Sequence, residues 1–102
     1  LSAAGDILHP MHQKGSTTAL YDSIADILFK SDISFANFES VITRQAPIEE
    51  RFDCVSAPIE CCSPEQFQHL AGGKHGGFTV LNIANNHSLD MGLEGLLTTQ
   101  QT

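Results

Sequence analysis

Basic residues are scarce in this sequence. Its 102 residues include five Lys and Arg against twelve Asp and Glu, which gives a formal net charge of −7. No basic stripe is present, so the electrostatic footprint of a nucleic-acid-binding protein is missing and we expect no nucleic-acid partner. The acidic surplus could hold a divalent cation, although in most soluble proteins such a balance reflects a solvated surface.

Cysteine is equally rare. The chain has Cys54, Cys61 and Cys62, an odd number, and a bridge between the adjacent pair would be strained, so no disulfide framework is predicted. The spacing Cys-x-x-Cys is absent, which argues against a structural zinc site. Nothing nearby marks any of the three thiols as an activated nucleophile, and we interpret them as buried and inert.

Long apolar runs are missing as well. No run reaches the length of about 18 residues that a membrane-spanning helix requires, so we expect no membrane segment in these residues. The composition is 41% hydrophobic and 17% charged, which is typical of a globular chain rather than a disordered one. The length allows one domain at most.

The pattern of apolar residues predicts alternating strands and helices. Ser16 or Thr17 can cap a helix with one apolar face, and Ser63-Pro64 followed by Gln66 is typical of a helix start with a capping box. The face of the first helix would contain Leu20, Ile24, Ile27 and Leu28, with Asp22, Asp26 and Lys30 on its solvated side; Phe67 and Leu70 of the second would face the core. Strands are expected at 1–6, 33–39 and 78–84, a short strand around 52–55, and a third helix from near Gly92. This order predicts an α/β fold with a mostly parallel sheet and crossover helices.

The stretch 78–92 is the most informative part of the chain. A nearly continuous apolar segment, 78–84, suits a strand buried on both faces of a parallel sheet. It ends abruptly in Asn85-Asn86-His87, with Asp90 three residues later. This polar end fits a functional site, because ligands of α/β sheets bind beyond the carboxyl ends of the strands. It also fits an ordinary turn, in which Asp90 caps the next helix.

Polar residues follow three predicted strands. Asp6 ends the first, Asn37 and Glu39 lie on one side at the end of the second, and Asn85-Asn86-His87 follow the third. Because parallel strands bring such ends together, we expect these side chains to converge. Carboxylate, amide and imidazole groups are ligands for divalent ions such as manganese, iron or zinc. Paired ions about 3.5 to 4 Å apart can clamp a phosphate and activate water, which makes phosphoester hydrolysis a candidate reaction.

Three motifs resemble the CapA family of poly-γ-glutamate capsule biosynthesis proteins, which belong to the calcineurin-like metallophosphoesterase superfamily. The motifs are Gly5-Asp6, the segment 35–40 (FANFES) with Ile42-Thr43, and the segment 84–92 (ANNHSLDMG) with Gly95-Leu96 and Thr99. The resemblance implies a partial metallophosphoesterase-like α/β sandwich. It covers residues 1–102 but only the amino-terminal part of the family's domain, because the later His-containing motifs are absent. We therefore expect a piece of a longer domain, truncated at both ends.

The resemblance also implies roles for individual residues. The metal ligands would be Asp6, Glu39 and Asn86, the catalytic acid or transition-state stabiliser would be His87, and the residues supporting them would be Asn37 and His9. The superfamily usually has a ligand His two residues after the first Asp, where this chain has Leu8. The implied cofactors are two divalent metal ions, Mn, Fe or Zn.

Two functions follow from the resemblance. The first is a metal-dependent phosphoesterase, which acts on a phosphate-containing small molecule during capsule biosynthesis. The second is a non-catalytic component of capsule polymer export or assembly that keeps the fold. Both imply a location at the bacterial cell envelope or outside the cytoplasm. We expect the 102 residues on their own to bind metal weakly and to lack turnover.

Overall fold

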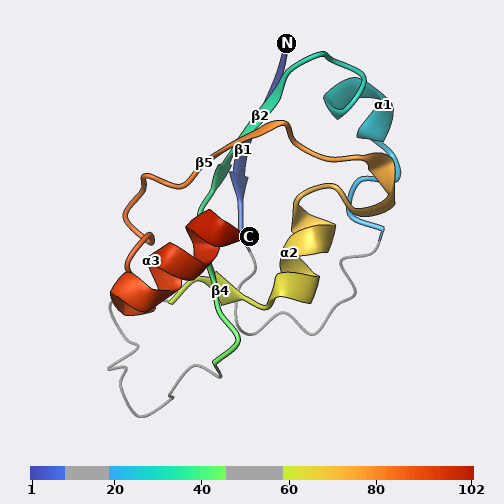
Figure 1. Ribbon diagram of the computed structural model, residues 1–102. Coiled ribbons are helices and arrows are strands. Elements are labelled where there is room, and N and C mark those ends of the chain that lie inside the picture. The colour runs from blue at the N-terminus through green and yellow to red at the C-terminus, as the bar shows by residue number, and fades with distance from the viewer. Residues whose placement is uncertain (9–18, 46–58) are drawn as a thin grey trace.

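The computed structural model describes residues 1–8, 19–45 and 59–102. It confirms the predicted α/β class with parallel strands and helices between them (Figure 1). The strands that begin at Ser2, Ser34 and Val80 run downward in Figure 1. The elements in chain order are β1 (Ser2–Ile7), α1 (Ala25–Leu28), β2 (Ser34–Phe38), β3 (Val41–Ile42), β4 (Cys61–Cys62), α2 (Pro64–Leu70), the 3₁₀ helix η2 (Gly73–His75), β5 (Val80–Asn82) and α3 (Gly92–Gln101).

The central strand of the larger sheet is β2. The sheet has three parallel strands in the order β1-β2-β5, and β2 carries the buried residues Ala36 and Phe38. The prediction that 78–84 forms a strand buried on both faces was wrong. β5 is a short edge strand, and Val80 is 48% exposed because the face of the sheet that it shares with Phe35 is open in the described part of the chain.

A second, two-stranded sheet extends the structure beyond β2. In it β3 pairs in parallel with β4, and Val41 lies opposite Cys61. The sequence did not predict β4; the short strand expected around 52–55 lies outside the described residues. Cys61 and Cys62 are buried free thiols, as predicted, and burial raises the pKa of Cys62 to about 12. Cys54 also lies outside the described residues.

The register of β1 shifts by one residue along its length. Ala3 lies opposite Phe35 of β2, whereas Asp6 lies opposite Asn37, so β1 has one residue more than β2 over this interval. Side chains alternate between the two faces of a strand, and an extra residue moves all later side chains to the other face. The irregularity therefore brings Asp6 to the face of Asn37 instead of the buried face of Phe38.

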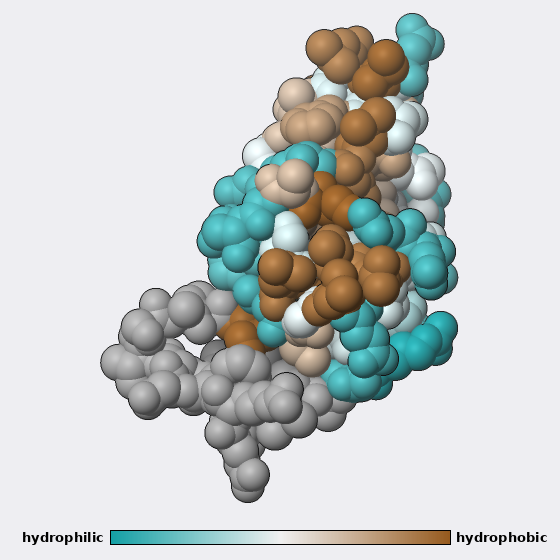
Figure 2. Space-filling view, turned by 60° about the vertical axis from the view of Figure 1, so that its left-hand side comes forward, coloured by the Kyte–Doolittle hydropathy of each residue, from teal (hydrophilic) through white to brown (hydrophobic). Residues whose placement is uncertain are grey.

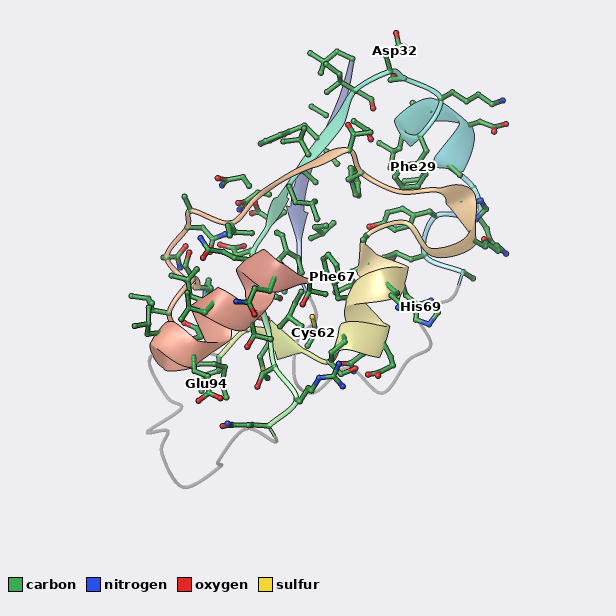
Figure 3. All side chains as sticks on the ribbon, viewed as in Figure 1. Phe29, Asp32, Cys62, Phe67, His69 and Glu94 are labelled. Atoms are coloured by element: carbon green, nitrogen blue, oxygen red, sulfur yellow. The ribbon has the colours of Figure 1, made fainter. Side chains whose placement is uncertain are left out.

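The hydrophobic core lies between α2 and the strands. Phe38, Ile42, Cys62 and Leu70 form its fully buried part, and Phe67 packs edge-on against Phe38 with ring centroids 5.1 Å apart. Figure 3 shows the side chains of Phe67 and Cys62 in this interior. The core-facing positions that the sequence assigned to α2 are thus confirmed.

The start of α2 also follows the prediction. The hydroxyl of Ser63 accepts a hydrogen bond from the backbone N–H of Gln66 at 3.2 Å, and the Gln66 side chain accepts one from the backbone N–H of Ser63 at 2.7 Å. Pro64 occupies the first turn, where its missing N–H costs nothing. All of these signals are local, which explains why the sequence predicts this helix end so well.

The first predicted helix is largely wrong. Of its described residues, 19–24 form turns and only Ala25–Leu28 form the single turn of α1, and the proposed core residues Leu20, Ile24 and Ile27 are 43–73% exposed. Tyr21 is buried instead. Its ring packs edge-on against Phe29 and its hydroxyl donates a hydrogen bond to the backbone carbonyl of Leu70 at 2.5 Å. The tertiary contacts of Tyr21 outweigh the helical periodicity of the sequence. The proposed cap residues 16 and 17 lie outside the described residues.

Apolar side chains also reach the surface. Figure 2 shows them gathered on one face of the molecule. The exposed large hydrophobic residues include Phe35 and Val80 on the sheet and Leu93 and Leu97 on α3. Within 1–8, 19–45 and 59–102, no helix has both the length and the apolar character needed to cross a bilayer.

The substitution Gly95→Ala is expected to destabilise the fold by about 1–2 kcal/mol. A β-carbon at Gly95 would lie 2.7 Å from Cγ1 of Val41, because α3 packs closely on β3. Helix propensity favours alanine by about 1 kcal/mol, whereas overpacking costs roughly 1–3 kcal/mol. The contact with Val41, and one of 2.6 Å with Cβ of Met91, put the cost in the upper half of that range, which leaves a net loss of about 1–2 kcal/mol. Urea denaturation measures the difference, with Gln100→Ala at an exposed position of α3 as the control. An unchanged or higher free energy of unfolding for Gly95→Ala would contradict this packing.

Candidate functional site at the carboxyl ends of the strands

Polar side chains of the three parallel strands meet in one row across the sheet. Asp6 of β1 lies opposite Asn37 of β2, which lies opposite Asn82 of β5. The Nδ2 of Asn37 donates a hydrogen bond to Oδ1 of Asp6 at 2.8 Å, and the Nδ2 of Asn82 donates one to Oδ1 of Asn37 at 2.7 Å. The structure thus brings Asp6 and Asn37 into direct contact.

Asn82 is a residue to which the sequence analysis assigned no role. It interrupts an otherwise apolar run between Leu81 and Ile83. Its place in that run was the available signal, because a polar residue inside a predicted strand is unusual unless it has a partner. The partner, Asn37, became apparent only from the register of β2 and β5.

Glu39 follows β2 directly and continues its pairing with β1. Its backbone N–H donates a hydrogen bond to the carbonyl of Ile7 at 2.9 Å. Asn37 and Glu39 are both partly buried, whereas Phe38 between them is fully buried, as the predicted alternation requires. The carboxylate of Glu39 is therefore on the same side of the chain as Asn37.

The segment after β5 is a hydrogen-bonded turn held by Asn85 and Ser88. The Nδ2 of Asn85 donates a hydrogen bond to the carbonyl of Phe38 at 2.9 Å, and its Oδ1 accepts one from the backbone N–H of His87 at 3.0 Å. The Ser88 hydroxyl donates to the carbonyl of Ile83 at 2.5 Å. Asn86 is exposed within this turn. The alternative prediction of a turn at this stretch is therefore confirmed, and the hydrogen bonds of the turn fix the backbone positions of Asn86 and His87.

His87 forms a pair with Asp90. Its Nδ1 lies 2.7 Å from Oδ2 of Asp90, and the same oxygen accepts a hydrogen bond from the backbone N–H of Glu60 at 2.8 Å. The prediction that Asp90 caps the following helix was wrong. The cap position of α3 is Met91, which makes no capping bond through its side chain, because the Asp90 carboxylate is engaged by His87 and by the residue preceding β4.

The surroundings of His87 favour its protonated form. The hydrogen bond to Asp90 raises the pKa of His87 most, partial burial opposes it, and the negative charges of Asp90, Glu39 and Glu60 add to the increase. Since Asp90 engages Nδ1, the second ring nitrogen, Nε2, is the one that can exchange a proton with a ligand. This arrangement suits a general acid near neutral pH.

Replacement of Asp90 by asparagine is expected to lower the pKa of His87 toward the ordinary value of about 6.5. The carboxylate stabilises the imidazolium, so its removal favours the neutral ring. An NMR titration of the His87 ring protons measures the change. Asp26→Asn serves as the control because Asp26 is an exposed partner of Lys30. A His87 pKa that stays the same in Asp90→Asn would refute the role assigned to this pair.

Comparison with known families identifies the chain. The model of the family described as bacterial capsule synthesis protein PGA_cap matches residues 1–102. The chain belongs to this family. The match confirms the CapA resemblance that the three sequence motifs suggested. No curated protein and no solved structure matches this PGA_cap chain.

The three residues that the resemblance implies as metal ligands carry oxygen donors. Asp6 is exposed, Glu39 is partly buried and Asn86 is exposed, so two carboxylates and one amide oxygen are accessible. Such oxygen donors suit hard or borderline ions. Residues 1–8, 19–45 and 59–102 contain no group of three or more His, Cys, Asp or Glu side chains arranged to hold a metal. His9, to which the resemblance assigned a supporting role, lies outside these ranges.

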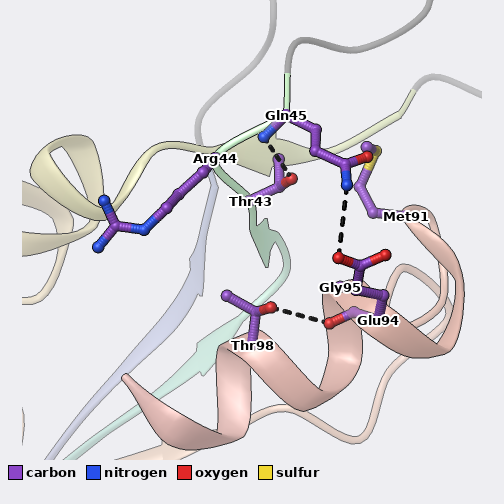
Figure 4. A pocket seen from close by; sticks show the side chains of 7 residues that line it. All are labelled: Thr43, Arg44, Gln45, Met91, Glu94, Gly95 and Thr98. Carbon is purple, nitrogen blue, oxygen red and sulfur yellow. Dashed lines mark hydrogen bonds between the residues drawn. The ribbon is translucent and has the colours of Figure 1, made fainter.

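A separate cavity lies between β3 and the start of α3. Its volume is about 230 Å³, and Figure 4 shows Gln45 reaching toward Glu94 across it. The residues that line it are Thr43, Arg44, Gln45, Met91, Glu94, Gly95 and Thr98. None of the residues assigned to the PGA_cap site is among them, so this cavity is distinct from the row of polar side chains.

His69 and His75 belong to none of the three motifs. His75 binds Asp22 through Nε2 at 2.7 Å, and Lys74 binds the same carboxylate at 2.9 Å. Hydrogen bonds from His75 and Lys74 lower the pKa of Asp22, which was predicted to be merely solvated. His69 is on α2, and His12 lies outside the described residues. Asp22, Lys74 and His75 therefore join the segment before α1 to η2.

Proposed function

We propose that this PGA_cap chain carries a metal-dependent phosphoesterase-type site that acts in the biosynthesis of a poly-γ-glutamate capsule. The observation that supports the proposal most is a continuous path of hydrogen bonds. It leads from the carboxylate of Asp6 through Asn37 and Asn85 to the backbone of His87. A proposed metal ligand and a proposed acid are thereby held in one polar unit at the carboxyl ends of three strands.

The proposed ligands are Asp6, Glu39 and Asn86, which would hold two divalent ions, Mn, Fe or Zn, together with further donors. When bound, such ions neutralise the charge of a phosphate and lower the pKa of a bound water. The hydrogen bond from Asn37 occupies Oδ1 of Asp6, and no hydrogen bond from the described part of the chain occupies the other carboxylate oxygen. This partial set of oxygen donors is compatible with the proposed ions.

The proposed task of His87 is to donate a proton to the leaving oxygen of the phosphoester. Asp90 holds Nδ1, which fixes the orientation of the ring and leaves Nε2–H as the proton donor. The raised pKa of His87 increases the fraction of the ring that carries this proton near neutral pH. Asp90 in turn accepts a hydrogen bond from the backbone N–H of Glu60, the residue before β4. The two-stranded sheet therefore helps to fix the position of Asp90 and, through it, the ring of His87.

Hydrolysis and metal content, measured side by side on the full-length protein, test the proposal. The protein is stripped with a chelator, reloaded with Mn, Fe or Zn, and assayed with p-nitrophenyl phosphate and its diester. We expect hydrolysis only after reloading. Absence of hydrolysis with all three metals, in a protein shown to be folded, would overturn the catalytic proposal.

A second candidate is a non-catalytic component of capsule polymer export or assembly. The observation that favours it is Leu8, which replaces the usual ligand His of the superfamily. This function predicts binding to the capsule polymer machinery that is independent of metal, at the bacterial cell envelope. Co-purification with the polymer synthase that persists in chelator and in Asp6→Ala would favour it over hydrolysis.

A further inference from the structure

The side chains of Asn37, Asn82 and Asn85 form a contiguous group, which we name the amide cluster. Both Asn82 and Asn85 donate to Oδ1 of Asn37, at 2.7 and 3.2 Å. The geometry points to a positioning role for Asn82 and Asn85: through Asn37 they orient the Asp6 carboxylate for metal binding. This inference rests on the proposed metal site and adds two residues that act behind its ligands.

The orientation of Asn85 is fixed by the backbone. An amide side chain has nearly the same shape when its oxygen and nitrogen are exchanged, so its partners must decide between the two orientations. The carbonyl of Phe38 can only accept and the N–H of His87 can only donate, which places Nδ2 of Asn85 toward Phe38 and Oδ1 toward His87. The second hydrogen on Nδ2 is then directed to Oδ1 of Asn37.

The orientation of Asn82 is fixed in the same way but by a different partner. Its Oδ1 accepts a hydrogen bond from the backbone N–H of Ala84 at 3.2 Å. Its Nδ2 therefore faces Asn37. Asn82 and Asn85 are thus each oriented by their own hydrogen bonds to the backbone. Both present an N–H group to Asn37, so the side-chain oxygen of Asn37 must point toward them.

Asn37 transmits this constraint to Asp6. With Oδ1 accepting two hydrogen bonds, the Nδ2 of Asn37 must face Asp6, where it donates at 2.8 Å. The oxygen of Asn37 is fully engaged, so Asn37 supports a ligand and is not itself one. The donated bond fixes the rotation of the Asp6 carboxylate, and within residues 1–8, 19–45 and 59–102 its second oxygen has no hydrogen-bond partner.

Replacement of Asn82 should weaken metal affinity by a measurable factor. Loss of a partner that orients a metal ligand typically weakens metal affinity by roughly 10- to 100-fold. Asn82→Asp has the same shape as asparagine but replaces the N–H donor by an acceptor. It also adds a negative charge, which by itself would attract a cation. The positioning role therefore predicts weaker binding, where simple electrostatics predicts tighter binding.

The experiment is a titration of the full-length protein with Mn²⁺, in which free Mn²⁺ is measured by electron paramagnetic resonance. The variants are Asn82→Asp, Asn82→Ala and, as a control that adds the same charge at an exposed amide, Gln68→Glu. We expect Kd to rise roughly 10-fold in Asn82→Asp, less in Asn82→Ala, and not to rise in Gln68→Glu. Circular dichroism gives the folded fraction, so that affinity is calculated for folded protein only.

The outcomes separate this inference from the proposed function. An unchanged or tighter Kd in Asn82→Asp overturns the positioning role, provided that Asp6→Ala loses binding in the same assay. If Asn82→Asp does not fold, an unchanged Kd in folded Asn82→Ala overturns it equally. If Asp6→Ala binds Mn²⁺ as well as the unaltered protein does, the metal site itself is wrong, and the positioning role fails with it.

Discussion

Replacement of His87 by alanine is expected to reduce phosphoester hydrolysis by about two to four orders of magnitude while the bound metal is retained. The reason is that His87 supplies the proton for the leaving oxygen and is not one of the proposed ligands. The Nδ1 of His87 contacts the side chain of Asp90 at 2.7 Å. Removal of the His87 ring therefore deletes the proposed acid without breaking a side-chain hydrogen bond to the backbone. Initial rates and metal content, measured on the same sample, test both halves of the statement.

The matched control is His75→Ala. His75 is also paired with a carboxylate, that of Asp22, but in a surface contact away from the strand ends. We expect its rate to equal that of the unaltered protein. Loss of metal together with activity in His87→Ala would instead identify His87 as a ligand. An unaltered rate would remove it from the chemistry altogether.

Replacement of Asp6 by alanine is expected to have the largest effect on metal affinity. Asp6 is the only carboxylate in the row across β1, β2 and β5, and one of its oxygens is held by Asn37. Loss of a ligand should weaken Mn²⁺ binding by more than the roughly 10- to 100-fold typical of losing a supporting partner. Glu39→Ala should also weaken Mn²⁺ binding or lower the number of bound ions in the same titration, because Glu39 is the second carboxylate among the proposed ligands.

The control for this experiment is Asp26→Ala, which removes the same charge from an exposed side chain paired with Lys30. It should leave Kd and stoichiometry unchanged, since exposed charges at a distance are screened by salt. Full-strength Mn²⁺ binding by both Asp6→Ala and Glu39→Ala would show that the metal, if bound, is held elsewhere. The non-catalytic assembly function would then be the better proposal.

The elements that the sequence predicted correctly are those with local signals. The capping box of Ser63 and Gln66 uses contacts only three residues apart, and both of its hydrogen bonds are present. The strand 33–39 was recognised from its β-branched and aromatic residues and the polar end that follows them, and it appears as β2. Local patterns of this kind can be predicted without the fold, because the groups involved are neighbours in any conformation.

The elements that were missed depend on distant partners. Tyr21 is buried by Phe29, Phe78 and the carbonyl of Leu70, and no feature near Tyr21 in the chain indicates this. The amphipathic spacing of 20–28 therefore predicted a long helix where α1 has one turn. Asp90 was expected to cap α3 because caps are local, but its partners are His87 and the backbone of Glu60, thirty residues away.

The sequence by itself determined the family and the chemical types at the site. Its three motifs were sufficient for the CapA resemblance, and the polar residues after each apolar run marked the carboxyl ends of the strands. Only the tertiary structure decided which of them touch. The register shift in β1 moves Asp6 to the face of Asn37, and the pairing of β2 with β5 brings Asn82 to the same row. Register is a property of paired strands, so a single strand's sequence cannot specify which residue of its neighbour lies opposite.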